Sequence, residues 1–171
     1  MKLLLSEKEI KDRIKVLASE ISLHYTTDDL LILGVLKGSF IFFADLVREI
    51  DVGNTTIEFV SISSYRGTKR CEIKGEQIDS KIFDNKHVLI VEDIIDTGKT
   101  VSYLLKEIDK SVVSSVEIVS FLFKPEYYKL DYKVKWHGFE VDNIFVIGYG
   151  LDYKENLRNL KDLYILDEKE Q

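Results

Sequence analysis

The chain has 171 residues, of which 45% are hydrophobic and 32% charged, with a formal net charge of −6. This length suits one domain with a substantial core, and the acidic balance argues against nonspecific binding to nucleic acid or to an anionic membrane. The only cysteine, Cys71, excludes an internal disulfide and a cysteine-based metal cluster, and no apolar run is long enough to span a membrane. We therefore expect one domain, residues 1–171, in the cytoplasm.

Helices and strands are predicted to alternate along the chain. Ser6 to Glu9 has the pattern of a capping box, and apolar residues follow at helical spacing until a helix end near Tyr25. The further expected elements are a strand at 30–35, a helix at 40–50, strands at 56–63 and 88–91, a helix at 98–110, and strands at 116–123, 143–148 and 163–166. The alternation predicts an α/β fold with a doubly wound, mainly parallel sheet flanked by helices, which binds ligands at the carboxyl ends of its strands.

Residues 64–83 form a long polar connection between two of these strands. The connection contains glycine and several cations, among them Arg66, Lys69, Arg70 and Lys74. A long connection in a small domain is usually either a functional lid or disordered. We interpret it as a flexible lid loop that excludes water from a site, and the alternative is a solvated hairpin without a catalytic role.

The most informative segment is residues 88–100. An apolar strand runs into two adjacent carboxylates, Glu92 and Asp93, and a third, Asp96, follows before Thr97-Gly98-Lys99-Thr100 opens an amphipathic helix. The unpaired N–H groups of a helix start suit a phosphate, and carboxylates beside them suit hydroxyls or a metal. A nucleotide-triphosphate P-loop is excluded, because its first glycine would stand where this chain has Asp93. The alternative is a strand, turn and helix with incidental acids.

The segment Glu92-Asp93-Ile94-Ile95-Asp96-Thr97-Gly98-Lys99-Thr100 resembles the phosphoribosyl pyrophosphate (PRPP) binding motif of type I phosphoribosyltransferases, in the form found in hypoxanthine-guanine phosphoribosyltransferases. The resemblance implies that Glu92 and Asp93 hold the ribose hydroxyls and that Asp96 is the catalytic general base. It also implies that Asp96 and the following loop bind the 5′-phosphate, through Thr97, Gly98, Lys99 and Thr100.

Other segments follow in the same order as in that family. Leu36-Lys37-Gly38-Ser39 resembles the family's pyrophosphate loop, in which the Leu–Lys peptide is commonly cis, and the sequence does not decide this here. The resemblance implies that Lys37, Gly38 and Arg158 bind PRPP. It also implies that Ser64 and Tyr65 are the serine–tyrosine pair of the lid.

Lys124 follows an apolar strand and is placed to recognise a base. An ammonium donates well to a carbonyl and is a poor partner for an amino group, which favours hypoxanthine or guanine over adenine. Residues 143–153 are similar to the family's base-binding segment, which implies that Phe145 stacks on the purine and that the backbone at Val146 reads its edge. Asp152 would contact the purine site and bind Mg²⁺ together with Glu92 and Asp93. The alternatives are a lysine that merely ends a strand and a core phenylalanine.

The resemblance implies the type I phosphoribosyltransferase fold, with a small hood and a mobile lid loop, and a Mg²⁺-dependent purine salvage enzyme. The enzyme would transfer 5-phosphoribosyl from PRPP to N9 of hypoxanthine or guanine, giving IMP or GMP and pyrophosphate, and would form a homodimer or homotetramer. Two alternatives remain open, a xanthine-preferring transferase of the same fold and a PRPP- or nucleotide-sensing regulator. The acidic charge and the lack of room for a helix-turn-helix domain argue against the regulator.

Overall fold

The computed structural model describes residues 1–26, 29–66, 71–75 and 78–166, and within these ranges it describes the backbone only for residues 63–66 and 71–75. The elements are, in chain order, β1 (Lys2–Leu5), α1 (Glu7–His24), β2 (Leu30–Leu36), α2 (Phe40–Glu49), β3 (Thr55–Arg66), β4 (Cys71–Gly75), the 3-10 helix η1 (Ser80–Phe83), β5 (His87–Ile95), α3 (Lys99–Ile108), β6 (Ser115–Phe123), β7 (Trp136–Glu140), β8 (Val146–Ile147) and β9 (Leu163–Ile165).

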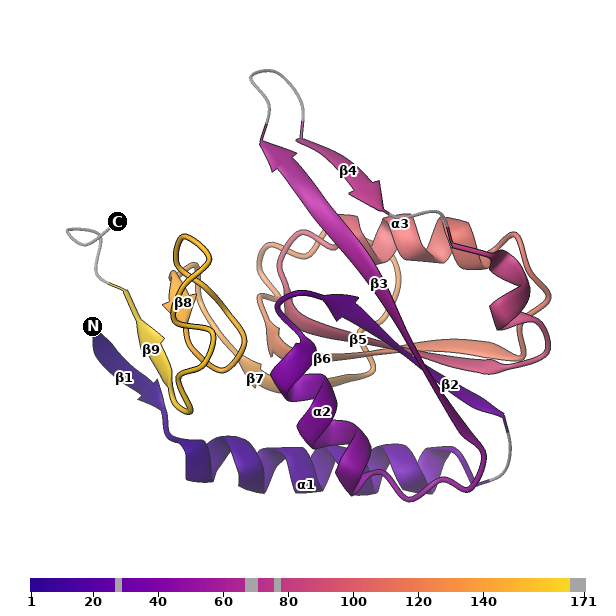
Figure 1. The fold of residues 1–171 in the computed structure, drawn as a ribbon, viewed down its shortest axis with the longest axis horizontal. Helices are drawn as coiled ribbons and strands as arrows, with labels where there is room; N and C mark the ends of the chain where they lie inside the picture. The colour runs from indigo at the N-terminus through magenta and orange to yellow at the C-terminus, as the bar shows by residue number, and fades with distance from the viewer. Residues whose placement is uncertain (27–28, 67–70, 76–77, 167–171) are drawn as a thin grey trace.

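The larger sheet has the strand order β4-β3-β2-β5-β6-β7. Strands β3, β2, β5, β6 and β7 are parallel, and β4 is antiparallel to β3. Alternate residues of the central strands enter two cores: Ile32 and Leu89 pack with α1 and α2, and Leu31 and Ile90 pack with α3. Figure 1 shows α1 and α2 on one side of the sheet and α3 on the other. The predicted doubly wound α/β fold is therefore confirmed.

A second, antiparallel sheet has the order β1-β9-β8, and we call it the hood. It joins the two ends of the described chain, because Lys2 pairs with Ile165. In Figure 1 the hood stands at the left, beside the loop that leads from β2 into α2. The expected small hood is thus present. We call residues 148–162 the hood loop.

The predicted capping box at the start of α1 is confirmed. The Ser6 hydroxyl accepts from the Glu9 amide, and the Glu9 carboxylate accepts from the Ser6 amide at 2.8 Å. The helix ends at His24, with Tyr25 as its C-cap residue. Among the described residues, none of the helices has the length and apolar character needed to cross a membrane.

Several element boundaries differ from the prediction. β5 runs to Ile95 instead of ending at Val91, because residues after Val91 stay paired with β6, as in Glu92 with Ser120. The carboxylate pair therefore lies within a strand. α3 begins at Lys99, because Gly98 adopts φ +82° and serves as its N-cap, and the helix ends at Ile108.

The connection at 64–83 is only partly a loop. Its described part contains the end of β3, strand β4 and η1, in which Phe83 is fully buried. The β3–β4 hairpin projects from the body of the molecule (Figure 1). Residues 67–70 and 76–77 lie outside the described part of the chain.

Candidate active site

The loop after β2 forms one wall of the site. The Leu36–Lys37 peptide bond is cis. At Gly38 a Cβ atom would overlap the carboxylate of Asp93, so only glycine allows the loop backbone to lie against that side chain. Ser39 is fully buried and its hydroxyl donates to the carbonyl of Val35 at 2.6 Å. The serine hydroxyl therefore holds the turn rather than facing a ligand.

A cavity of about 510 Å³ lies at the carboxyl ends of β2 and β5. Ser61 and Ile62 of β3 and residues of the hood loop also line it. The predicted site residues in its lining are Lys37, Gly38, Glu92, Asp93, Thr100, Asp152 and Arg158. Segments distant in sequence thus meet at one place, as the parallel topology requires.

The carboxylates of Glu92 and Asp93 dominate the electrostatics of the cavity. Glu92 is buried, and burial raises its pKa well above the usual value, with a further contribution from the negative charge of Asp93. Burial also raises the pKa of Asp93, although the Ile94 amide, which donates to its Oδ1 at 2.8 Å, and the charge of Arg158 oppose the shift. A cation or several hydroxyl donors would relieve this unbalanced negative charge.

Arg158 reaches the cavity from the hood loop. One of its terminal nitrogens lies 2.8 Å from the Asp152 carboxylate, and the other donates to the Gly150 carbonyl at 2.9 Å. Its Nε is buried and has no hydrogen-bond partner among the described residues. A Cβ at Gly150 would overlap the Gly38 carbonyl, so the hood loop packs directly on the loop after β2. The guanidinium is therefore fixed at the cavity, and its Nε–H donor is unused among the described residues.

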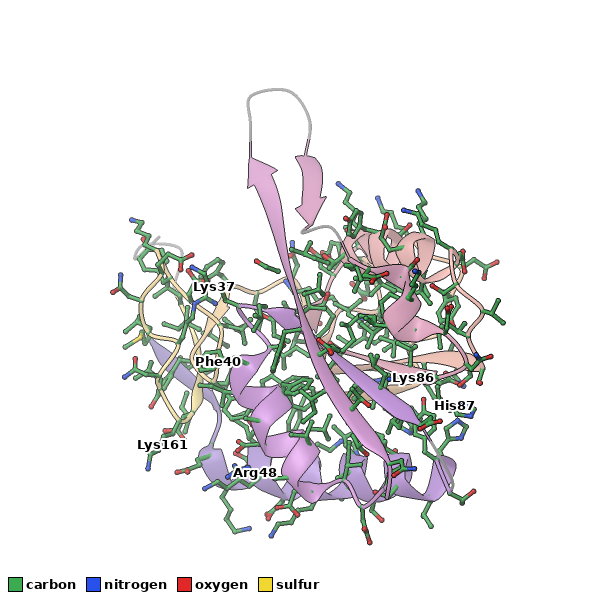
Figure 2. All side chains as sticks on the ribbon, turned by 45° about the vertical axis from the view of Figure 1, so that its right-hand side comes forward. Lys37, Phe40, Arg48, Lys86, His87 and Lys161 are labelled. Atoms are coloured by element: carbon green, nitrogen blue, oxygen red, sulfur yellow. The ribbon has the colours of Figure 1, made fainter. Side chains whose placement is uncertain are left out.

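Two further sets of contacts link side chains of the hood loop with neighbouring segments. Buried Tyr149 donates its hydroxyl to the Asp45 carboxylate on α2 at 2.7 Å. Lys37 donates to the Glu155 carboxylate at 3.0 Å, and Arg158 lies 3.5 Å from the other oxygen of Glu155. Figure 2 shows Lys37 on the side of the molecule that carries the hood. Glu155 was not among the predicted site residues, and its only signal in the sequence is a carboxylate close to Arg158.

The predicted phosphate loop lies at the start of α3. Gly98 makes the left-handed turn, and a Cβ there would lie 2.7 Å from the Tyr128 ring. Within the described part of the chain, no side chain caps the helix start, which leaves the amides of the first turn available to an anion. Of this loop, Thr100 lines the cavity, whereas Asp96 and Lys99 are exposed and Thr97 is half-buried.

Of the predicted base-binding residues, Asp152 lines the 510 Å³ cavity, whereas Lys124, Phe145 and Val146 are not part of its lining. Lys124 is buried, its ammonium donates to the Ile144 carbonyl at 3.2 Å, and its amide donates to the Ile95 carbonyl, next to Asp96. Phe145 is 42% exposed, so the alternative that it is a core residue is wrong. Its neighbour Val146 is buried in β8. An exposed aromatic ring and a buried ammonium thus flank the carboxyl end of β6.

Two predictions, the lid residues and the set of metal ligands, receive less support from the described residues. Ser64 and Tyr65 lie in β3, paired with Ile73 and Glu72 of β4, and their side chains fall outside the described part of the structure. Glu92, Asp93 and Asp152 line one cavity, but among the described residues no three histidine, cysteine or acidic side chains form a group that could hold a metal ion.

Comparison with known proteins agrees with this arrangement. Residues 2–154 match the phosphoribosyl transferase domain family. The match, the parallel sheet and the carboxylate pair beside a glycine loop define the chain as a phosphoribosyltransferase. It is 40% identical over 168 residues to the hypoxanthine-guanine phosphoribosyltransferase of Bacillus subtilis (strain 168), covering 96% of this chain and 92% of the relative. The chain belongs to the hypoxanthine-guanine phosphoribosyltransferase family.

Solved structures give the same result. A crystal structure of a hypoxanthine phosphoribosyltransferase from Staphylococcus aureus is similar with a TM-score of 0.90 and 36% identity, covering 99% of this chain and 92% of that chain. The hypoxanthine phosphoribosyltransferase from Trypanosoma cruzi, in complex with the product IMP, has a TM-score of 0.85 and 34% identity, covering 99% of this chain and 95% of that chain.

Proposed function

We propose that this chain transfers the 5-phosphoribosyl group of PRPP to N9 of hypoxanthine or guanine, with IMP or GMP and pyrophosphate as products, in purine salvage. The observation that carries the proposal is the cavity in which Gly38, the Glu92–Asp93 pair and Arg158 meet beside the start of α3. Relatives that match nearly the whole chain carry the corresponding enzyme name.

The chemistry of the cavity fits the two ends of PRPP. Glu92 and Asp93 supply acceptors for the ribose hydroxyls, and the uncapped start of α3, with Thr97 to Thr100, supplies donors for the 5′-phosphate. Cleavage of the bond at C1′ builds positive charge on the ribose, while the leaving pyrophosphate gains negative charge. The amides of the loop after β2 and the Arg158 guanidinium would stabilise that leaving group.

Mg²⁺ suits the same cavity. Glu92, Asp93 and Asp152 line it without forming a three-ligand metal group, so they would hold the ion together with the phosphates of PRPP. Mg²⁺ prefers oxygen ligands and is commonly bound by one or two carboxylates together with substrate phosphates. Burial raises the pKa values of Glu92 and Asp93, and a cation beside them would favour their charged forms. When bound, the ion would supply positive charge against the pyrophosphate oxygens.

The base would occupy the region between β6 and the hood. We assign the 6-oxo group of the purine to Lys124, whose ammonium has three donors and, among the described residues, two acceptors, the Ile144 carbonyl and the Asn143 side chain. Phe145 would stack on the ring, the Val146 backbone and Asp152 would contact its edge, and Asp96 would share the N7 proton while N9 attacks. Lys124 and Asp96 both favour a 6-oxopurine over adenine.

Lid closure and self-association complete the proposal. Ser61 and Ile62 line the cavity, so the β3–β4 hairpin begins at the site that residues 64–83, with Ser64 and Tyr65, would cover. The side chains of Phe40, Ile57 and Phe59 on α2 and β3 are exposed, and we assign them to the surface of a homodimer or homotetramer. The cytoplasmic location stays a prediction.

A spectrophotometric assay with PRPP and Mg²⁺ tests the reaction. Hypoxanthine, guanine, xanthine and adenine are compared in parallel, and we expect turnover of the first two with adenine inert. Fastest turnover of xanthine would keep the mechanism and change the substrate. PRPP binding without turnover of any base would favour the nucleotide-sensing regulator instead.

A further inference from the structure

Among the described residues, the Glu155 carboxylate contacts the two cationic side chains that line the cavity and could bind a pyrophosphate group, those of Lys37 and Arg158. One carboxylate oxygen accepts from Lys37 at 3.0 Å, and the other lies 3.5 Å from Arg158. Glu155 itself lines the cavity. Its pKa is lowered first by Lys37 and then by Arg158, so it carries a full negative charge at neutral pH. A carboxylate of the chain thus occupies donors that an anionic ligand would need.

These contacts are not what holds the hood loop to the body. The Lys37 and Glu155 side chains are 69% and 67% exposed, and an ion pair this exposed adds little to stability. Arg158 has closer partners in Asp152 and the Gly150 carbonyl. The packing of Gly150 on Gly38 joins the two segments without Glu155. Because the ion pair is exposed and adds little to stability, an anionic ligand can replace the Glu155 carboxylate on Lys37.

The backbone directs Glu155 toward this position. Its φ is +64°, in the left-handed region that non-glycine residues rarely adopt, and Lys154 and Leu157 are also left-handed. The Glu155 amide donates to Asp152 Oδ2 at 2.8 Å, which fixes the turn. The loop thus presents the Glu155 side chain to the cavity, and rotation of that side chain alone would withdraw the carboxylate.

We propose that Glu155 is a built-in competitor of pyrophosphate: its carboxylate binds Lys37 and Arg158 when the cavity is free, must leave when PRPP or pyrophosphate binds, and returns as pyrophosphate departs. This inference rests on the proposed function. Like charge drives the exchange, because a multiply charged pyrophosphate bound to Lys37 and Arg158 would repel the Glu155 carboxylate from the same two cations. The consequence is weaker binding of pyrophosphate and faster release of this product.

The test measures binding of inorganic pyrophosphate, with Mg²⁺ present, by titration calorimetry to the full chain. Glu155→Gln keeps the size of the side chain and removes its charge. We expect its Kd to be about two- to fivefold lower than that of the wild type. Glu49→Gln is the matched control, because it removes one exposed carboxylate at the far end of α2. Its Kd should equal that of the wild type.

A double-mutant cycle separates competition from a general charge effect. If Glu155 acts by occupying Lys37, the gain from Glu155→Gln should shrink at least twofold in a Lys37→Gln background. Unchanged or weaker pyrophosphate binding by Glu155→Gln, with normal wild-type turnover, would overturn this inference and leave the proposed function intact. A wild type that neither binds pyrophosphate nor turns over any base would overturn both.

Discussion

At the scale of single residues, Asp96 is the group whose role is most open to test. It is exposed at the end of β5, one residue before the phosphate loop. If it shares the N7 proton in the transition state, Asp96→Asn should lower kcat by about two to four powers of ten and change PRPP binding much less. Steady-state kinetics and PRPP calorimetry on the same preparation measure the two effects. Turnover close to that of the wild type would contradict the general-base assignment.

Lys124 should separate base recognition from PRPP binding. It is buried and lies outside the cavity assigned to PRPP, so Lys124→Ala should weaken binding of hypoxanthine and guanine about tenfold or more, with PRPP binding unchanged. Calorimetry with each ligand checks this. Lys129→Ala is the control, because this exposed lysine lies two residues beyond the turn at 125–127. Equal losses for base and PRPP would mean that Lys124 holds the structure through the Ile144 carbonyl.

At the scale of elements, the close approach of the loop after β2 to β5 is a steric requirement. A methyl group at Gly38 would overlap the Asp93 carboxylate. Gly38→Ala should therefore displace the loop, lower the free energy of unfolding by about 1–3 kcal/mol and weaken pyrophosphate binding at least tenfold. Gly53→Ala is the matched control, since a Cβ there meets nothing within 4 Å. Thermal unfolding and pyrophosphate calorimetry test both variants, and wild-type binding by Gly38→Ala would refute the packing argument.

Sequence patterns predicted the elements that have a strong periodicity of their own. The capping box and apolar spacing of α1, and the buried runs of β2 and β6, are clear without tertiary contacts. β1 and β4 were not predicted, because each exists through pairing with a partner, Tyr164 with Leu3 and Ile73 with Ser64. The predicted strand at 143–148 is reduced to Val146–Ile147, since only these residues pair with β9.

The candidate site likewise contains residues that a sequence motif can indicate and contacts that it cannot. Glu92, Asp93 and the loop before α3 are contiguous in sequence, so a motif can indicate them. The contact of Lys37 with Glu155 spans 118 positions, and no local pattern specifies a contact of that kind. The close approach of Gly38 to the Asp93 carboxylate likewise arises only when β2 and β5 are neighbours in the sheet. Contacts between residues so far apart in sequence can be identified only when the fold is known.

At the scale of the whole molecule, the parallel sheet and the loop after β2 bury two adjacent carboxyl groups of one strand that repel each other. Glu92 and Asp93 lie beside each other under the loop after β2, and burial raises both pKa values. These groups contribute stability that is fully present below the unfolded-state pKa, which for glutamate is 4.5, and is lost as pH rises through the higher folded-state pKa. The ligand-free protein should therefore be destabilised by its own active site at neutral pH.

Glu92→Gln should remove this destabilisation. At pH 7 the variant is expected to unfold several degrees above the wild type, since 1 kcal/mol shifts the Tm of a domain of this size by about 2–4 °C. The difference should disappear as pH falls below about 4.5, where the wild-type carboxyl is protonated in both states. Thermal unfolding of both proteins between neutral pH and that limit measures it, and PRPP binding by the variant should be weaker. A constant Tm difference across this range would show that packing at position 92, rather than charge, sets the stability, and would remove the electrostatic basis for a cation at the pair.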